Sequence, residues 1–206
     1  MKILGITGGV GSGKSRILYD LEHIYGAYIV EADKVAHELM QPDNDIYIKI
    51  VDTFGKSILS EEYPYEIDRK KLGDIVFNNE TKLLALNNIT HPMVKNAIKN
   101  KISEIRNAGE HKLFVIEAAL LIQDNYSEIC DEIWYIWVSR EERIKRLAAQ
   151  RGYSEEKTIS IFESQETDDY YKKYANYTIN NNLGYDFSTK QLKERLNIFL
   201  ADDIID

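Results

Sequence analysis

The stretch GGVGSGKS, residues 8–15, lies between the apolar run KILGIT and a segment whose hydrophobic residues have helical spacing. It matches G-x-x-x-x-G-K-[ST], the phosphate-binding loop in which glycines allow backbone N–H groups to turn inward around a phosphate. The helix that follows adds the positive end of its dipole. A chance glycine-rich turn is the weaker interpretation, because the pattern is complete and lies between a strand and a helix.

Each part of this loop has an expected task in binding a nucleoside triphosphate. The Lys14 ammonium can reach the β- and γ-phosphates, and the Ser15 hydroxyl can ligate Mg²⁺. The residues expected to bind MgATP are Gly8, Gly9, Val10, Gly11, Ser12, Gly13, Lys14, Ser15 and Arg16.

The bulk composition is that of a globular domain and excludes several classes of protein. With 206 residues, 44% hydrophobic and 29% charged, the chain is long enough for one medium-sized core. A net charge of −8 argues against a general nucleic-acid surface. The lone Cys130 allows no internal disulfide and favours a reducing compartment. The longest apolar runs are shorter than the ~18 residues of a membrane span. We expect a cytoplasmic protein without a nucleic-acid or membrane partner, and the sequence carries no signature of an oligomeric state.

Alternating apolar and helical patterns predict one α/β domain with a parallel sheet. The expected strands are 1–7, 27–33, 112–121, 131–139 and 175–181. The expected helices are 14–26, 34–40, 45–55, 68–79, 80–109, 140–152, 154–165 and 186–200, with Ser154 as an N-cap. The helix over 80–109 is expected to bend or break near Pro92, whose ring excludes a backbone hydrogen bond.

We therefore expect residues 1–206 to form a single P-loop domain, a three-layer αβα fold around a five-stranded parallel sheet. Its core comprises about 1–34, 111–139 and 175–206. A helical insertion over about 35–110 and a small lid over about 140–174 interrupt that core.

Carboxylates at strand ends are the candidate chemical groups beside the loop. Asp33 ends the second strand, where it could orient an acceptor hydroxyl and take its proton, or else act as the N-cap of the next helix. Glu31, expected on the same face of that strand, is the second choice. Glu117 ends the third strand, where it could help to hold Mg²⁺ or pair locally.

Basic side chains crowd the helix expected over 140–152, namely Arg140, Arg143, Lys145, Arg146 and Arg151. Acidic residues lie among them, so a solvated, salt-bridged face is one interpretation. The other is a lid whose arginines fold over the transferring phosphates, and we favour it because the helix follows a strand and ends at Gly152. Arg146 and Arg151 are the expected phosphate contacts.

These residues together resemble the dephospho-CoA kinase family over about residues 3–182. ITGGVGSGKS is similar to the family's opening, and ADKVAHELM to its second, acidic motif with Asp33 as the base. DRKKLGDIVF followed by His91-Pro92 is the specific part, while EAALL, the KRL of the lid, SQ and ANYTINNN keep the family's order and spacing.

The resemblance implies phosphorylation of the ribose 3′-hydroxyl of dephospho-CoA by ATP, with Mg²⁺ as cofactor. It implies catalytic roles for Lys14, Asp33 and Arg146, and substrate contacts for Asp33, Arg69 and His91. It also implies that Ser15 binds the metal directly and that Glu117 binds it through a water molecule. The chain departs from the family pattern at Arg16, Glu31, Ala119, Gln123, Gln150 and Asn176. Gln150 stands at the second lid-arginine position, and the one-residue shift to Arg151 turns that side chain by about 100°.

Two other functions fit parts of the pattern. A P-loop kinase for another small acceptor, such as a nucleoside or nucleotide, would share the loop and the lid. A nucleotide-dependent switch would share the loop alone, and Asp33 and the arginine-rich lid argue against it.

Overall fold

The computed structural model describes residues 1–77 and 79–201. Asn78, at the end of a predicted helix, and residues 202–206, assigned to the predicted core, lie outside the described residues. Among the helices described, none combines the length and apolar character needed to cross a membrane.

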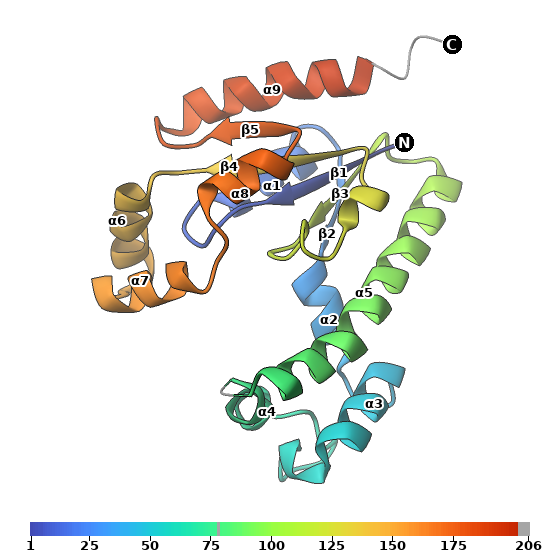
Figure 1. Cartoon of the computed structure of the whole chain (residues 1–206). Coiled ribbons are helices and arrows are strands. Elements are labelled where there is room, and N and C mark those ends of the chain that lie inside the picture. The colour runs from blue at the N-terminus through green and yellow to red at the C-terminus, as the bar shows by residue number, and fades with distance from the viewer. Residues whose placement is uncertain (78, 202–206) are drawn as a thin grey trace. The chain divides into compact units, whose positions relative to one another are not determined.

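Five strands form one sheet in the order β2-β3-β1-β4-β5 (Figure 1). Their bounds are β1 Lys2–Thr7, β2 Tyr28–Glu31, β3 Leu113–Glu117, β4 Glu132–Trp137 and β5 Tyr177–Asn180. β1 pairs in parallel with β3 and β4, and β4 with β5. The prediction of an α/β fold around a five-stranded parallel sheet is therefore confirmed.

Helices cover both faces of this sheet. Neighbouring residues of a strand face opposite sides, and two such neighbours in β4 contact different helices. Trp134 of β4 packs in a cluster with Ile17 and Leu21 of α1, Lys14–His23, and with Leu196 of α9, Tyr185–Ala201. Tyr135, the next residue, stacks at 4.9 Å on Tyr171 of α8, Asp168–Tyr174. These contacts place the sheet between two helical layers.

The segment predicted as a lid, about 140–174, contains α6, Arg140–Arg151, α7, Glu155–Glu163, and α8. Ser154 is the N-cap of α7 and accepts from the Lys157 N–H, as predicted. Helix α8, which the sequence analysis did not predict, begins at a Thr167 cap.

A short 3₁₀ turn, η2, spans Tyr126–Glu128, and burial raises the pKa of Tyr126 to about 12.

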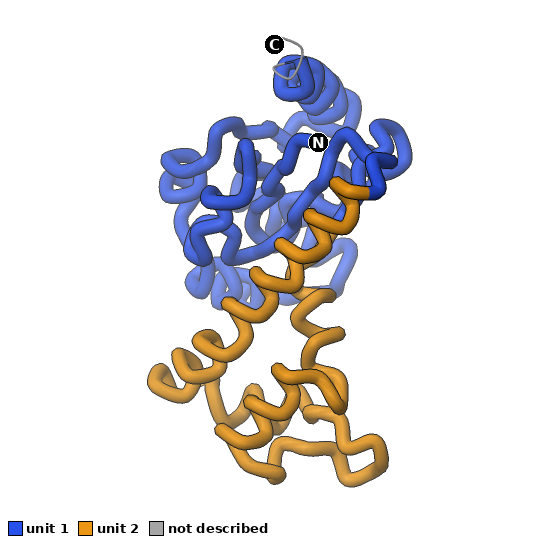
Figure 2. Tube along the Cα trace, turned by 90° about the vertical axis from the view of Figure 1, so that its right-hand side faces the viewer, with its two compact units in different colours: residues 1–29, 108–206 blue, residues 30–107 orange. Residues whose placement is uncertain are grey.

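The chain divides into two compact units, residues 1–29 with 108–206 and residues 30–107 (Figure 2). The second unit is mostly helical, as predicted. It contains α2 Ala32–Leu39, α3 Asp45–Phe54, the 3₁₀ turn η1 Lys56–Ile58, α4 Arg69–Val76 and α5 Glu80–Ala108.

One detail of this helical unit corrects a prediction from the sequence, and a second excludes one of two predicted alternatives. The strand expected to reach residue 33 ends at Glu31, and α2 begins directly at Ala32. The long helix α5 runs through Pro92, which excludes the predicted break, while the alternative of a bend stays a prediction. Proline removes one backbone bond there, but buried Val94, Ile98 and Ile102 continue the apolar face beyond it.

Candidate active site

The loop GGVGSGKS connects β1 to α1, as the sequence predicts. Gly13, the N-cap of α1, has a left-handed backbone with φ of 83° and makes no side-chain capping bond. Gly13 therefore provides no side-chain cap for the first N–H groups of α1. A helix N-terminus of this kind can bind an anion with these N–H groups. A Cβ on Gly13 would lie 2.5 Å from Nδ2 of Asn181, so glycine is required there for two reasons.

Lys14 and Glu117 meet beside the loop. The Lys14 ammonium donates to the Gly8 carbonyl at 2.6 Å and lies 3.6 Å from Oε1 of Glu117. The register of β1 and β3 pairs Glu117 with Ile6, which brings the carboxylate to the end of the strand that carries the loop. Both side chains are largely buried, at 17% and 13% exposure, so their electrostatic interaction is stronger than that of a surface pair.

Ser15 and Glu117, the two metal ligands predicted from the sequence, both lie at the loop. Ser15 is exposed at the start of α1, and Glu117 supplies a carboxylate. Residues 1–77 and 79–201 contain no group of three or more His, Cys, Asp or Glu side chains that could hold a metal. A magnesium ion with one or two protein ligands and further phosphate and water ligands suits such a site.

Arg146 of α6 lies next to the loop. Its Nε is 3.1 Å from Oε1 of Glu142, and its Nη2 donates to the Asn181 carbonyl at 2.9 Å. Asn181 in turn donates from Nδ2 to the Ser12 carbonyl at 2.8 Å. Asn181, the residue that follows β5, therefore joins the lid arginine to the phosphate loop through its backbone carbonyl and its side-chain amide.

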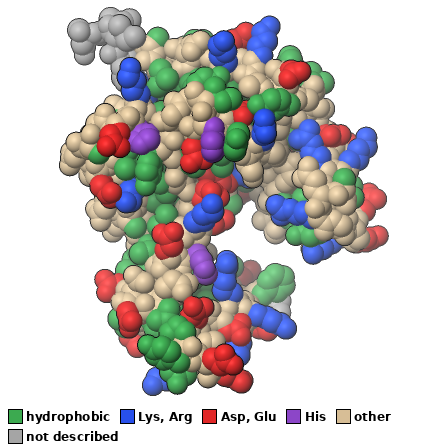
Figure 3. Space-filling model, turned by 180° about the vertical axis from the view of Figure 1, so that it is seen from behind, with side chains coloured by type: hydrophobic (Ala, Val, Ile, Leu, Met, Phe, Trp, Pro, Cys, Tyr) green, Lys and Arg blue, Asp and Glu red, His purple; other side chains and the backbone are tan. Residues whose placement is uncertain are grey.

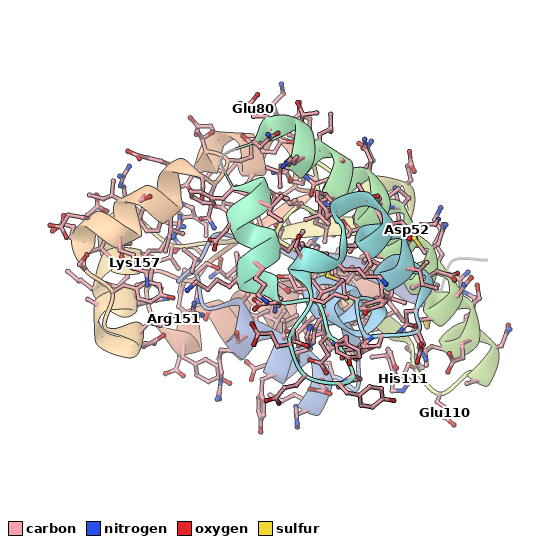
Figure 4. The ribbon with its side chains drawn as sticks, turned by 90° about the horizontal axis from the view of Figure 1, so that it is seen from below. Asp52, Glu80, Glu110, His111, Arg151 and Lys157 are labelled. Carbon is pink, nitrogen blue, oxygen red and sulfur yellow. The ribbon has the colours of Figure 1, made fainter. Side chains whose placement is uncertain are left out.

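The other lid arginine of the sequence analysis has different surroundings. Arg151 is exposed at the end of α6, about 140° around the helix from Arg146. Figure 4 shows Arg151 on α6 and Lys157 on α7. On the part of the surface that α6 and α7 form, Figure 3 shows Lys and Arg side chains together with Asp and Glu side chains. A phosphate contact of Arg151 stays a prediction.

The side chain of Arg16 turns toward α9. Its guanidinium carbon is 4.4 Å from the ring centroid of Tyr185, and its Nε is 3.6 Å from Oδ1 of the buried Asp20. The Tyr185 hydroxyl also donates to Asp20. The predicted ATP contact of Arg16 stays a prediction, and the structure gives this side chain protein partners that also include the ring of Tyr19, 5.3 Å from the guanidinium carbon.

Asp33 is exposed in the first turn of α2. The N-cap of α2 is Glu31, which makes no side-chain capping bond, so the alternative in which Asp33 is the N-cap is wrong. Glu31 pairs instead with Lys34 at 2.6 Å. Because the helix begins at Ala32, Glu31 and Asp33 do not share one face of a strand. The proposed base role of Asp33 stays a prediction.

The remaining predicted substrate contacts lie in the same helical unit as Asp33. Arg69 is exposed as the first residue of α4, whose N-cap Asp68 accepts from the N–H groups of Lys70 and Lys71. These bonds, that to Lys71 first, lower the pKa of Asp68. His91 is half-buried on α5.

The sequence analysis assigned no individual role to three residues that contact the loop, namely Arg143, Gln165 and Asn181. Arg143 is one of several arginines on one helix, and Gln165 and Asn181 lie in the segments SQ and ANYTINNN, to which the resemblance gave no individual residue roles. The available signals were this resemblance and position, because Asn181 directly follows a strand of a parallel sheet.

Comparison with known proteins agrees with this geometry. The family model for dephospho-CoA kinase matches residues 2–186. A dephospho-CoA kinase of Carboxydothermus hydrogenoformans is 38% identical over 192 residues, covering 93% of this chain and 91% of the relative. The structure of dephospho-CoA kinase from Campylobacter jejuni has a TM-score of 0.70 at 25% identity, covering 98% of this chain and 100% of that one. The structure of TT1252 from Thermus thermophilus has a TM-score of 0.79 at 24% identity, covering 98% and 97% of the two chains, and shows the same fold. This chain therefore belongs to the dephospho-CoA kinase family.

Proposed function

We propose that this chain transfers the γ-phosphoryl group of ATP to the ribose 3′-hydroxyl of dephospho-CoA, giving coenzyme A and ADP. The observation that carries the proposal is the complete phosphate loop with Lys14 and Glu117 paired beside it, in a chain of this family. The location of the protein in the cytoplasm stays a prediction from the sequence.

Charge neutralisation is the main task of the loop in this reaction. Phosphoryl transfer passes through a loose transition state, so catalysis depends on positioning and on electrostatic stabilisation. Lys14 would neutralise charge between the β- and γ-phosphates. Arg146 is connected to the loop through Asn181. From this position its guanidinium would stabilise charge on the transferring group. Arg16 and Arg151 are the other candidates for ATP contacts.

The donors beside the loop suit magnesium bound together with the nucleotide. Ser15 would contribute its hydroxyl, and Glu117 would act through a bound water. The ion would supply charge compensation to the phosphates. Glu117 also holds Lys14, so the same carboxylate orients the ammonium and serves the metal.

The acceptor side of the reaction is assigned to the helical unit. Asp33 is exposed and close in sequence to the end of β2, so its carboxylate is open to an acceptor hydroxyl and could take its proton. Arg69 and His91 would bind the coenzyme substrate, in line with the resemblance of their segments to the family.

An ADP-release assay with separate acceptors tests this function. Purified protein with MgATP should release ADP only when dephospho-CoA is added, and mass spectrometry should find coenzyme A. Nucleosides and nucleoside monophosphates serve as competing acceptors. Faster transfer to one of them would replace the proposed acceptor, and acceptor-independent hydrolysis would favour a nucleotide switch.

A further inference from the structure

Among the arginines of α6, Arg143 is the one that the fold buries. It is 8% exposed, whereas Arg140 and Arg151 are exposed. Its guanidinium carbon lies 4.0 Å from the ring centroid of Phe162 on α7. Cations of this kind are rarely buried unless their donors have partners. The partners of Arg143 therefore indicate what its side chain does.

Two hydrogen bonds connect Arg143 to the phosphate loop and to a second side chain that binds the loop. Its Nε donates to the Val10 carbonyl at 2.8 Å, and its Nη2 donates to Oε1 of Gln165 at 2.7 Å. The same Gln165 oxygen accepts from the Val10 N–H at 3.4 Å. One pair of side chains therefore binds both backbone polar groups of Val10.

The loop is shaped to admit this guanidinium. A Cβ on Gly9 would fall 2.3 Å from Nη2 of Arg143, far inside contact distance. A Cβ on Gly11 would fall 3.0 Å from Leu147, one turn further along α6. Side chains of α6 thus pack directly on loop glycines, and the close approach requires residues without a Cβ.

Burial makes Arg143 costly, which argues against a purely stabilising role. Removal from water lowers its pKa, and the neighbouring Tyr135 and Asp168 act in the opposite direction. Asp168 is itself held by the Tyr135 hydroxyl and the Trp137 indole. A buried ionic network is weak support for stability, and an aromatic and aliphatic core could fill the same space.

The peptide geometry indicates what the Arg143 contact achieves. In a trans peptide the carbonyl oxygen and the next N–H point in opposite directions. Fixing the Val10 carbonyl on α6 therefore turns the Gly11 N–H away from α6. We propose that Arg143, together with Gln165, is a positioning residue that fixes the Val10–Gly11 peptide so that its N–H faces the nucleotide phosphates. The inference rests on the proposed function only in that the loop binds a nucleotide.

Direct measurement of ATP binding, without an acceptor, tests this role. Arg143→Met keeps an unbranched apolar stem against Phe162 but removes all five donors. Its dissociation constant for ATP should rise about 10- to 100-fold, the range for hydrogen bonds to a charged group. With acceptor present, KM for ATP should rise more than kcat falls. Arg143→Lys should recover part of the affinity, because it keeps the charge without the fork.

Arg140→Met is the matched control. Arg140 is exposed on the same helix, with its guanidinium carbon 5.5 Å from the same Phe162 ring. The Arg140→Met substitution should change the dissociation constant for ATP less than twofold. Equal losses in the two variants would mean that only net charge matters, and would overturn the proposal. An Arg143→Met protein that unfolds at a lower temperature yet binds ATP like the wild type would also overturn it.

Gln165→Met provides a second test that leaves Arg143 intact. If Arg143→Met fails to fold, this variant alone tests the positioning role. It should weaken ATP binding, and an unchanged dissociation constant would refute the positioning role. The acceptor assignment is independent of these results. If the variants behave as expected but dephospho-CoA is not phosphorylated, only the acceptor is wrong. If the wild type binds no ATP, the loop assignment fails with the inference.

Discussion

Gly9→Ala should weaken nucleotide binding by displacing Arg143 from the phosphate loop. The added methyl would lie 2.3 Å from Nη2 and 2.6 Å from Cζ of Arg143, and 2.8 Å from Oε1 of Gln165. These distances are well below van der Waals contact, so one of the two side chains has to move. Gly9 does not have a left-handed backbone, so its own conformation should tolerate alanine.

The size of the effect follows from the bonds that the displacement breaks. Arg143 makes one hydrogen bond to the Val10 carbonyl and one to Gln165. A hydrogen bond to a charged group contributes about 1.5–3 kcal/mol, and about 1.4 kcal/mol corresponds to a factor of ten. Loss of the loop contact alone should therefore raise the dissociation constant for ATP about 10- to 100-fold.

Isothermal titration with ATP, combined with thermal unfolding, measures this effect. Gly73→Ala is the control, because Gly73 lies inside α4 with open space around its Cβ position. It should leave ATP binding unchanged and stabilise the fold by about 0.5–1 kcal/mol. In an Arg143→Met background the cost of Gly9→Ala should shrink, since both changes remove the same contact. Wild-type affinity in Gly9→Ala, or full additivity in the double variant, would refute the reasoning.

Three further variants test the proposed chemistry. Lys14→Ala should abolish detectable transfer in a folded protein, because it removes the charge facing the β- and γ-phosphates; near-normal turnover would contradict the loop assignment. Asp33→Asn should lower kcat about 10²- to 10⁴-fold with little change in ATP affinity, whereas a surviving kcat would exclude Asp33 as the base. Arg146→Ala should lower kcat more than Arg151→Ala, because Arg146 lies against the loop; unchanged kcat/KM in both would make the lid arginines a solvated face.

The fold was predictable because its signals are local. Buried parallel strands are short apolar runs, and the loop between β1 and α1 is a complete motif. The failures occurred where one local signal competed with another. Pro92 favours a bend or a break in α5, and the break is excluded because the helix and its buried apolar face continue beyond the proline. The apolar pattern places Asp33 at the end of a strand, but α2 begins one residue before it.

The candidate site was predictable only where one residue type at one spacing carries the chemistry. Lys14 belongs to the motif, and Glu117 ends a strand that the parallel topology places beside the loop. No spacing rule separates Arg143 from the other arginines of α6. Their difference is burial, and burial depends on Phe162 and Gln165, which are 19 and 22 residues further along the chain. Such a role becomes visible only when tertiary contacts are known.

The contacts of the loop follow a pattern that explains how it can present N–H groups to an anion. Its carbonyl oxygens at alternate positions each accept from a side chain: Gly8 from Lys14, Val10 from Arg143, and Ser12 from Asn181. Since a carbonyl and the following N–H point in opposite directions, each of these bonds turns one N–H away from its donor. Lys14 is the donor closest to the predicted phosphates, so its bond to Gly8 is the one that a nucleotide would compete for. The bonds from α6 and from the residue after β5 come from the sides of the loop and can persist with nucleotide bound. The lid helix and the end of β5 thereby hold the loop in a binding conformation, and the N–H groups need little reorganisation when the phosphates arrive.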